Sequence, residues 1–394
     1  MNLNYFHDLF TDLEQQLWRY RPYWQFQPMQ QAALPEPFAF LPPEFANELQ
    51  QLDFAECAQL DADDNALGER FSKYFAHWQC PQLPRTLAEP VAAPFWLSTG
   101  ISGRKWQQIC QFAGAIGQKE LPVLEWCAGK GHLGRVFAGQ FGNEVHSLEW
   151  QASLCDEGQQ LAGKFQFRQF FHHVDVLKQP TASYFQQHQQ WVALHACGDL
   201  HRVGLQNAVA AGTQDIALVP CCYHLQSADS YLHRSATARH SRLQLNKQDL
   251  RLAVQGHATG GARIERLSQQ EMLWRHAFWA YAQSQGQPDY RPLRSVAKQM
   301  FSDDIAGFFT FACQQQALAV PSTAAMESAL VVAERRLLNQ RRLELCQHVF
   351  RRPLELYLVT DLALLLAEQG YQVELQELCA SNLTPRNLLL SAKR

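Results

Sequence analysis

The sequence predicts an α/β fold with a mostly parallel sheet of seven strands covered by helices. Apolar strands alternate with helical stretches between residues 123 and 221, a pattern typical of parallel sheets with both faces covered. A glycine-rich loop follows the first of these strands and precedes a helix start. Near the C-terminus, strand-like segments at 371–378 and 387–392 predict an antiparallel hairpin added to the sheet.

The first strand and its loop occupy residues 123–135. Val123 and Leu124 end a buried strand, and Gly129 and Gly131 let the backbone turn tightly and approach a ligand because neither has a Cβ. The helix expected at 132–140 points its amide groups at this loop, where they stabilise an anionic group. The pattern predicts a nucleotide-cofactor pocket, and a tight turn without a ligand is the alternative.

Two acids decide which cofactor the loop fits. Residues 129–134 satisfy the dinucleotide fingerprint G-x-G-x-x-G, and Glu149, at the end of a short strand at 144–148, matches the ribose-binding acid about 20 residues further on. Glu125 precedes the loop, where a carboxylate would repel pyrophosphate. It would instead favour the amino group and sulfonium of S-adenosylmethionine (SAM). The prediction is a SAM site that includes Glu125, Gly129, Gly131 and Glu149.

Three further segments end in polar residues where an open α/β sheet binds its ligands. The strand at 165–171 leads to Asp175, which is placed to accept from an adenine amino group; a surface Asp in a turn is the alternative. The strand from residue 191 breaks into a loop with His195 and Asp199, and the strand from residue 215 ends in Cys222 and His224.

Three motifs in order carry a resemblance to a known group. The stretch EWCAGKGHL at 125–133 resembles motif I of class I SAM methyltransferases, with Cys127 in place of the first glycine and Ala128 after it. Together with CGDLH at 197–201 and PCCYH at 220–224, it resembles the methyltransferase-like family, which includes eukaryotic ribosomal RNA adenine dimethylase domain proteins.

That family is related to the acceptor-stem tRNA 2′-O-methyltransferases. The resemblance covers residues 95–260 and 355–394 and implies a Rossmann-like class I methyltransferase with SAM as cofactor and RNA, tRNA or rRNA, as substrate. The chain lacks the N-terminal Cys/His zinc module of the tRNA enzymes. It also lacks the Asn/Asp-Pro-Pro-Tyr loop of enzymes that methylate exocyclic amines, since residues 195–199 occupy that place.

Methyl transfer from a sulfonium is a direct displacement, so the protein must align the acceptor, and a side chain can also remove a proton from it. Asp199 and His224 are the expected acceptor-side groups, with Cys222 beside them, whereas His195 is placed with the cofactor and is a second candidate base. For both histidines the alternative is a hydrogen-bonded structural role. Lys105 is either a partner of the methionine carboxylate or a surface lysine.

The adjacent cysteines allow other chemistry. A thiolate of Cys221 or Cys222 is a possible nucleophile toward a pyrimidine. With His224 they are also a possible metal site, but zinc ligands usually lie two to four residues apart, and no metal is expected. Small buried packing residues are the remaining interpretation.

Residues 1–90 predict a helical N-terminal extension, with helices at the start and at 44–60. Residues 91–394 predict the methyltransferase domain, interrupted at about 226–352 by a mostly helical insertion with a turn at 259–262. That insertion holds 17 Lys and Arg against 10 Asp and Glu, although the whole chain has a net charge of −3. The basic surface is suited to phosphates, and a solvated helical face is the alternative.

Eleven cysteines without a CxxC pair indicate a reducing cytoplasm, and no apolar run is long enough for a bilayer. The sequence does not fix the oligomeric state. Three alternatives to an RNA methyltransferase stay open. They are a non-catalytic RNA- or protein-binding module, a methyltransferase for proteins or small molecules, and an NAD-dependent oxidoreductase, which Glu125 and the terminal hairpin oppose.

Overall fold

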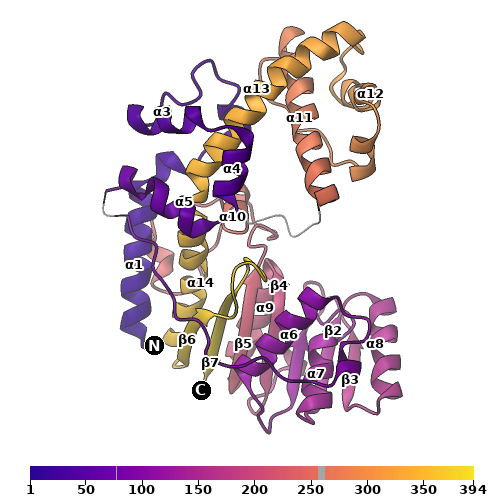
Figure 1. Cartoon of the computed structure of the whole chain (residues 1–394). Coiled ribbons are helices and arrows are strands. Elements are labelled where there is room, and N and C mark those ends of the chain that lie inside the picture. Colours follow the sequence, from indigo (N-terminus) through magenta and orange to yellow (C-terminus); the bar gives the residue numbers. More distant parts are fainter. Residues whose placement is uncertain (77, 256–261) are drawn as a thin grey trace. The chain divides into compact units, whose positions relative to one another are not determined.

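The computed structural model describes residues 1–76, 78–255 and 262–394 (Figure 1). The chain forms two compact units, each assembled from segments that are distant in sequence. The sheet unit comprises residues 1–19, 80–255 and 351–394, and the helical unit comprises residues 20–79 and 256–350. The boundaries expected at residues 90 and 226 both fall inside the sheet unit, whereas the one expected at about 352 lies next to the change of unit between residues 350 and 351. The turn expected at 259–262 falls almost entirely outside the described residues.

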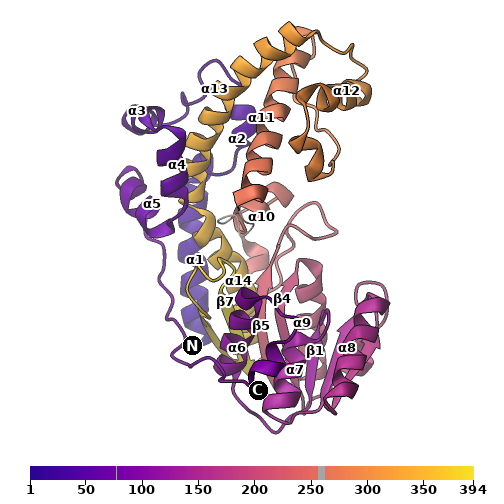
Figure 2. The same ribbon diagram turned by 45° about the vertical axis from the view of Figure 1, so that its right-hand side comes forward.

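A seven-stranded sheet with the order β3-β2-β1-β4-β5-β7-β6 forms the centre of the sheet unit (Figures 1 and 2). Its first five strands are parallel, whereas β7 is antiparallel to both β5 and β6. This confirms the predicted mostly parallel sheet with its terminal hairpin. The strands are β1 (Val123–Trp126), β2 (Val145–Glu149), β3 (Gln169–His173), β4 (Gln190–Cys197), β5 (Asp215–Cys221), β6 (Gln372–Glu377) and β7 (Leu388–Lys393).

Helices connect the parallel strands, as parallel pairing requires. The helices of this unit are α1 (Leu3–Arg19), α6 (Gly103–Ile116), α7 (His132–Gln140), α8 (Ala152–Lys164), α9 (Asp199–Ala211), α10 (Lys247–Leu252) and α14 (Arg351–Glu368), with 3-10 turns at Phe95–Ser98, Ala182–Tyr184 and Ala238–His240. No helix in the described part of the chain is both long and apolar enough to span a bilayer.

The two faces of the central strands pack against different helices. On one face, Val123 joins residues of α6 and α7 in a buried apolar cluster. On the other face, the Trp126 and Trp191 rings lie 6.2 Å apart, and Trp126 Nε1 donates to the Leu200 carbonyl of α9 at 2.8 Å. Since alternate strand residues share a face, Glu125 lies on the α6–α7 face together with Val123.

The helical unit contains α2 (Pro28–Gln31), α3 (Pro43–Gln51), α4 (Phe54–Asp61), α5 (Asp64–Phe71), α11 (Ala262–Ser284), α12 (Ile305–Gln316) and α13 (Thr323–His348), with 3-10 turns at Arg21–Tyr23, Ser72–Tyr74 and Lys298–Ser302. Its N-terminal segments pack along α13, where Arg342 Nε donates to the Leu52 carbonyl at 2.8 Å and Gln347 Nε2 donates to the Trp24 carbonyl at 2.6 Å. These contacts join residues roughly three hundred positions apart.

The single helix expected at 44–60 was wrong, because the chain breaks it at Asp53. The Asp53 carboxylate accepts from the Glu56 amide at 2.8 Å, and the Glu56 carboxylate accepts from the Asp53 amide at 2.9 Å. This reciprocal capping box starts α4. The first helix belongs to the sheet unit instead, where Phe10 stacks on Tyr357 of α14 at 4.6 Å between ring centroids.

Candidate functional site

The glycine-rich loop turns through three left-handed residues, Cys127, Gly129 and Gly131, with φ of 56°, 59° and 65°. The Ala128 amide donates to the carbonyl of Leu148 in β2 at 2.9 Å, which ties the loop to the neighbouring strand. The helix α7 begins directly after Gly131. The loop therefore presents backbone amides at the carboxyl edge of the sheet, as an anion site requires.

Glu149 ends β2 and holds this loop from the side. It is 5% exposed, its Oε2 accepts from the Gly129 amide at 2.9 Å, and its Oε1 accepts from the Gln151 amide at 3.0 Å. Each carboxylate oxygen has a second lone pair available for a further donor. The arrangement is suited to a ribose diol, whose two hydroxyl groups would donate to the two oxygens.

Glu125 lies behind the loop and is 3% exposed. Its Oε1 accepts from the Gly134 amide of α7 at 3.0 Å, and its Oε2 accepts from Ser147 Oγ at 2.6 Å and from Gln169 Nε2 at 3.4 Å. Burial raises the pKa of Glu125 to about 7, although these donors and the Lys105 charge oppose the shift. The carboxyl group thus links the start of α7 to β2 and β3. A positive charge brought near it would lower its pKa and favour the ionised form.

A Glu125→Gln variant is expected to remove a pH dependence of stability. Because the folded-state pKa is raised from 4.5 to about 7, the unfolded chain loses this proton first, and the free energy of unfolding falls between pH 4.5 and pH 7. Wild type should lose about 3 kcal/mol relative to the variant over that interval. Urea unfolding of both proteins at a series of pH values measures the difference. A difference that stays constant from pH 4.5 to 8 would contradict this account.

Arg135 was not predicted from the sequence, yet it fixes the segment before α6. It is 2% exposed, and its Nη1 donates to the carbonyls of Leu97 and Thr99 at 3.2 and 3.1 Å. Its Nη2 lies 3.1 Å from His132 Nδ1, and burial lowers the pKa of His132 to about 3, so this neutral ring accepts the hydrogen bond. Arg135 thereby ties the segment around Leu97 to the start of α7.

Asp175 lies in a turn just beyond β3. Its Oδ1 accepts from the Leu177 amide at 3.2 Å, and its Oδ2 lies 3.0 Å from Lys178 Nζ. The hydrogen bond from Lys178 lowers the pKa of this carboxyl group. Both oxygens of the Asp175 carboxylate therefore have partners within this turn, and the side chain remains partly exposed.

His195 interrupts β4. Its φ is 62°, and the pairing of β4 with β5 shifts register between Leu194 and Ala196. The Nε2 of His195 lies 3.0 Å from Gln108 Oε1 on α6, so this nitrogen donates. Burial lowers the pKa of His195 to about 4, which leaves the ring neutral at physiological pH.

Three cysteines meet where β4 and β5 end: Cys197, Cys221 and Cys222, called the thiol cluster below. Their sulfur atoms all lie within 4.8 Å of one another, and Cys197 Sγ is 3.1 Å from Cys221 Sγ. Hydrogen bonds from Cys197 and Cys221 hold the pKa of the Cys222 thiol below its usual range, with help from the positive charge of Arg386.

The glycine loop and the thiol cluster influence each other electrostatically. Burial raises the pKa of Cys127, and the charges of Glu149, Cys197 and Glu125 raise it further. Cys127 is therefore within electrostatic reach of both acids and of the cluster. The structure brings together the residues predicted at the ends of β1, β2, β4 and β5, whereas Asp175 keeps to its own turn.

His224 follows the thiol cluster. Its Nδ1 is buried and has no hydrogen-bond partner among the described residues. Burial lowers its pKa, and the charges of Arg251 and Arg386 lower it further, whereas Cys222 raises it. The Arg386 guanidinium is held in place by a 2.8 Å hydrogen bond to the Val254 carbonyl. Positive charge thus surrounds this end of the site.

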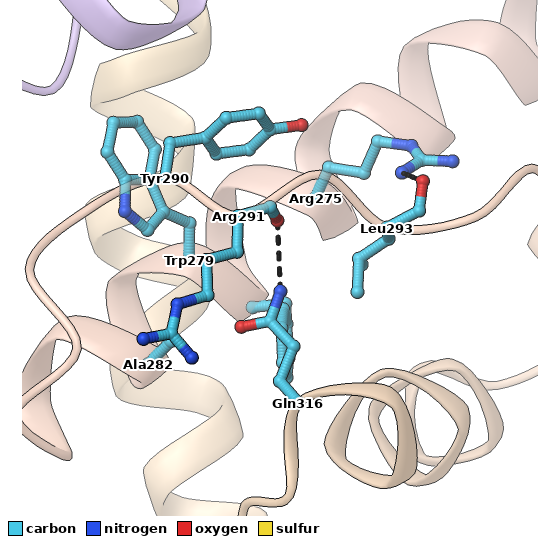
Figure 3. A pocket seen from close by; sticks show the side chains of 8 residues that line it. Arg275, Trp279, Ala282, Tyr290, Arg291, Leu293 and Gln316 are labelled. Atoms are coloured by element: carbon cyan, nitrogen blue, oxygen red, sulfur yellow. Dashed lines mark hydrogen bonds between the residues drawn. The ribbon is translucent and has the colours of Figure 1, made fainter.

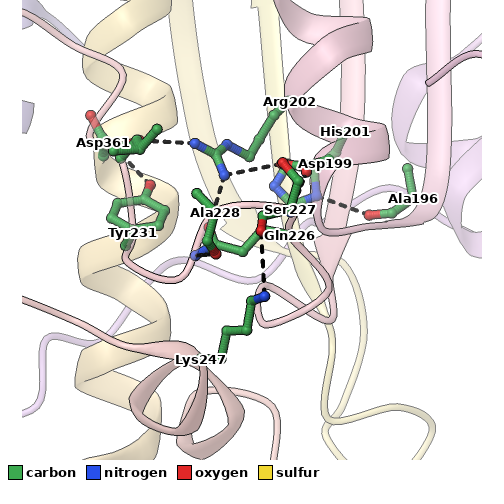
Figure 4. Close-up of polar contacts among 11 residues, drawn as sticks. Ala196, Asp199, His201, Arg202, Gln226, Ser227, Ala228, Tyr231, Lys247 and Asp361 are labelled. Carbon is green, nitrogen blue, oxygen red and sulfur yellow. Dashed lines mark hydrogen bonds and ion pairs between the residues drawn. The ribbon is translucent and has the colours of Figure 1, made fainter. Parts of the chain in front are cut away.

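Asp199 begins α9 and binds the loop after β5 (Figure 4). Its Oδ1 accepts from Arg202 Nη1 at 3.1 Å, and its Oδ2 accepts from the Ser227 amide at 2.7 Å. Arg202 Nη1 also donates to Gln226 Oε1 at 2.8 Å, and Nη2 donates to the Leu232 carbonyl at 3.1 Å. Both carboxylate oxygens therefore position the acceptor-side loop.

Gly198 explains why this loop can close. Its φ is 55°, and a Cβ there would lie 1.7 Å from the Leu225 carbonyl oxygen. The next amide, of Asp199, donates to that same oxygen at 3.0 Å. Only a residue without a side chain allows the loop after β5 to approach the end of β4 so closely.

Among the described residues, two hollows have linings that contain none of the predicted site residues. In the helical unit, a cavity of about 10 Å³ beside Trp279, Tyr290 and Arg291 has room for no more than a water molecule (Figure 3). In the sheet unit, an open groove of about 710 Å³ runs between residues 85–90, α6 and residues 378–383, with Arg85 and Arg104 in its lining. The first is too small for a substrate.

Comparison with known proteins supports a specific class of chemistry. Residues 104–229 match a family model described as a methyltransferase domain. The matched segment includes the glycine loop, Glu149, the thiol cluster and Asp199. No curated protein matches the chain. The methyltransferase domain supports methyl transfer as the activity.

Proposed function

We propose that this protein is a SAM-dependent methyltransferase that acts on RNA. The observation that carries the cofactor assignment is the Glu149 carboxylate, which holds the Gly129 amide and keeps lone pairs on both oxygens at the edge of the loop. The space beside Gly129 supports it, because a Cβ built there meets no atom within 4 Å. Together, these features fit a ribose and the chain attached to it.

The residues around the loop match the charges of SAM. Glu149 would hold the ribose hydroxyls, and the amides at the start of α7 would face the methionine carboxylate. Glu125 would supply negative charge behind the loop for the amino group and the sulfonium, with Cys127, Ala128 and Gly131 shaping the backbone. Asp175 would reach the adenine amino group after release from Lys178. When bound, SAM supplies an activated methyl group.

The acceptor side would bind and orient the nucleophile. His195 is neutral and fixed by Gln108, so it would keep its position, while His224 has a buried nitrogen free to exchange a proton. Cys222 would line the acceptor pocket beside it. Asp199 would act as a positioning residue, since both its oxygens hold the loop that carries these groups.

Positive charge at the acceptor side favours an anionic substrate such as tRNA or rRNA. The charges of Arg251 and Arg386 lower the pKa of His224, and the charge of Lys105 lowers the pKa of His195. Arg239, Arg242 and Arg251 are exposed on the same unit. In contrast, several arginines of the expected basic insertion are engaged internally, among them Arg275 with Glu271, Arg336 with Gln283, and Arg352 with Glu355 and Glu377.

All eleven cysteines are free, which is consistent with a reducing compartment, and we place the reaction in the cytoplasm. Incubation of the full chain with isotopically labelled SAM and total RNA, followed by mass spectrometry of nucleosides, tests the substrate. Labelled methyl in an RNA nucleoside that is also missing from cells lacking the gene is the expected result. Binding of SAM without labelled RNA, with label in protein or small molecules instead, would contradict the RNA assignment.

A further inference from the structure

The thiol cluster has the geometry of a metal site. We infer that Cys197, Cys221 and Cys222 bind one thiophilic metal ion, for which Zn²⁺ is the natural probe. This inference does not depend on SAM binding or on the RNA substrate. It departs from the sequence expectation of no metal, which rested on the adjacency of Cys221 and Cys222.

The backbone removes that objection. Adjacent residues of an extended strand point to opposite faces, so two neighbouring cysteines would not ordinarily share an ion. Cys222, however, has a left-handed backbone with φ of 45°, which turns its side chain out of the strand pattern. Cys197 and Cys221 are direct partners in the register of β4 and β5 and so share a face. All three sulfur atoms consequently meet at one point.

The distances fit a shared ion. Thiolates bound tetrahedrally to Zn²⁺ at about 2.3 Å lie about 3.8 Å from one another. The sulfur atoms of the cluster lie within 4.8 Å of one another, and Cys197 Sγ lies 3.1 Å from Cys221 Sγ, so the required spacing falls between these two values. Small rotations of three side chains would complete the set.

The surroundings match the charge of such a site. Binding would replace three S–H bonds by three S–Zn bonds and would release up to three protons, which leaves a net charge of −1. The positive charge of the Arg386 guanidinium already acts on Cys222 and would offset it. The buried Nδ1 of His224, which has no partner among the described residues, is a candidate fourth ligand after a side-chain rotation.

A disulfide between Cys197 and Cys221 is the competing explanation. It would use two of the three sulfur atoms and would leave the left-handed backbone at Cys222 unexplained. Left-handed non-glycine residues cost free energy and persist where the surrounding structure uses them. A shared ion uses all three thiols and accounts for that conformation, so the observations favour the metal.

The zinc content of the full-length protein tests the inference. The chain is purified without chelators and with any tag removed, and zinc is measured by plasma mass spectrometry. About one zinc per chain is expected for wild type, with at least about a five-fold loss in Cys197→Ser, Cys221→Ser and Cys222→Ser. Matched controls are the half-exposed Cys80→Ser and the buried Cys110→Ser, which should retain the metal.

A second measurement does not depend on the folding of any variant. Zinc K-edge absorption of the wild-type protein should show three sulfur ligands at about 2.3 Å. Zinc that is substoichiometric, removed by mild EDTA treatment and unaffected by the cluster variants would be an adventitious ion only and would overturn the inference. A Cys197–Cys221 disulfide in the mass map of the freshly isolated protein would overturn it as well.

Discussion

A Gly129→Arg variant is expected to lose SAM affinity by about 100-fold or more, equivalent to roughly 2.7 kcal/mol. Gly129 has a φ of 59°, and its missing Cβ points into open space beside Glu149. An arginine side chain would occupy the volume that we assign to the cofactor and would pair with the Glu149 carboxylate. Isothermal titration calorimetry of wild type and variant with SAM measures the loss.

Gly142→Arg is a matched control for this experiment. Gly142 also has a positive φ, of 76°, and a Cβ there also meets no atom within 4 Å, so the two variants carry similar backbone strain. Gly142 lies beyond the C-terminal end of α7, and this helix, which follows the glycine loop, is about 13 Å long. Unaltered heat of SAM binding in Gly129→Arg, or equal losses in both variants with intact folds, would contradict the assignment of the loop.

The second large effect is expected for Asp361, a fully buried carboxylate on α14 that holds the loop following β5 (Figure 4). It accepts from Tyr231 Oη, from the Arg234 amide and from the Ser235 amide, each at 2.8 Å. Asp361→Ala would leave these three donors buried without an acceptor. We expect a loss of about 3–5 kcal/mol in the free energy of unfolding, measured by chemical denaturation.

The controls for Asp361 separate a lost acceptor from a lost charge. Asp156→Ala removes an exposed carboxylate from α8 and should change stability by no more than about 0.5 kcal/mol. Asp361→Asn retains one acceptor oxygen and should give an intermediate loss. Equal stability of Asp361→Ala and Asp156→Ala would show that this loop does not depend on the carboxylate.

The sheet and the glycine-rich loop could be predicted from the sequence because each depends on a pattern of residues close together in the chain. Alternation of apolar strands with helices indicated the sheet, and Glu125, the glycines and Glu149 have a fixed spacing along the chain. The break between α3 and α4 was also local, since Asp53 and Glu56 have capping-box spacing within the helix expected at 44–60.

Other features depend on contacts that no local pattern encodes. The packing of residues 20–79 along α13 joins segments from opposite ends of the chain, so the sequence boundaries could not anticipate the two units. The loop partners of Asp199 and the carbonyl partners of Arg135 appear only after folding. The left-handed backbone of Cys222 likewise leaves no compositional signal.

Titration of the wild-type chain with SAM tests the central claim most directly. The account predicts one site per chain with a dissociation constant in the micromolar range, roughly −8 kcal/mol in binding free energy. It also predicts no comparable heat with NAD, because the Glu125 carboxylate behind the loop would repel a pyrophosphate bound at the α7 amides. The absence of SAM binding to the folded chain, or binding of NAD in its place, would contradict the account.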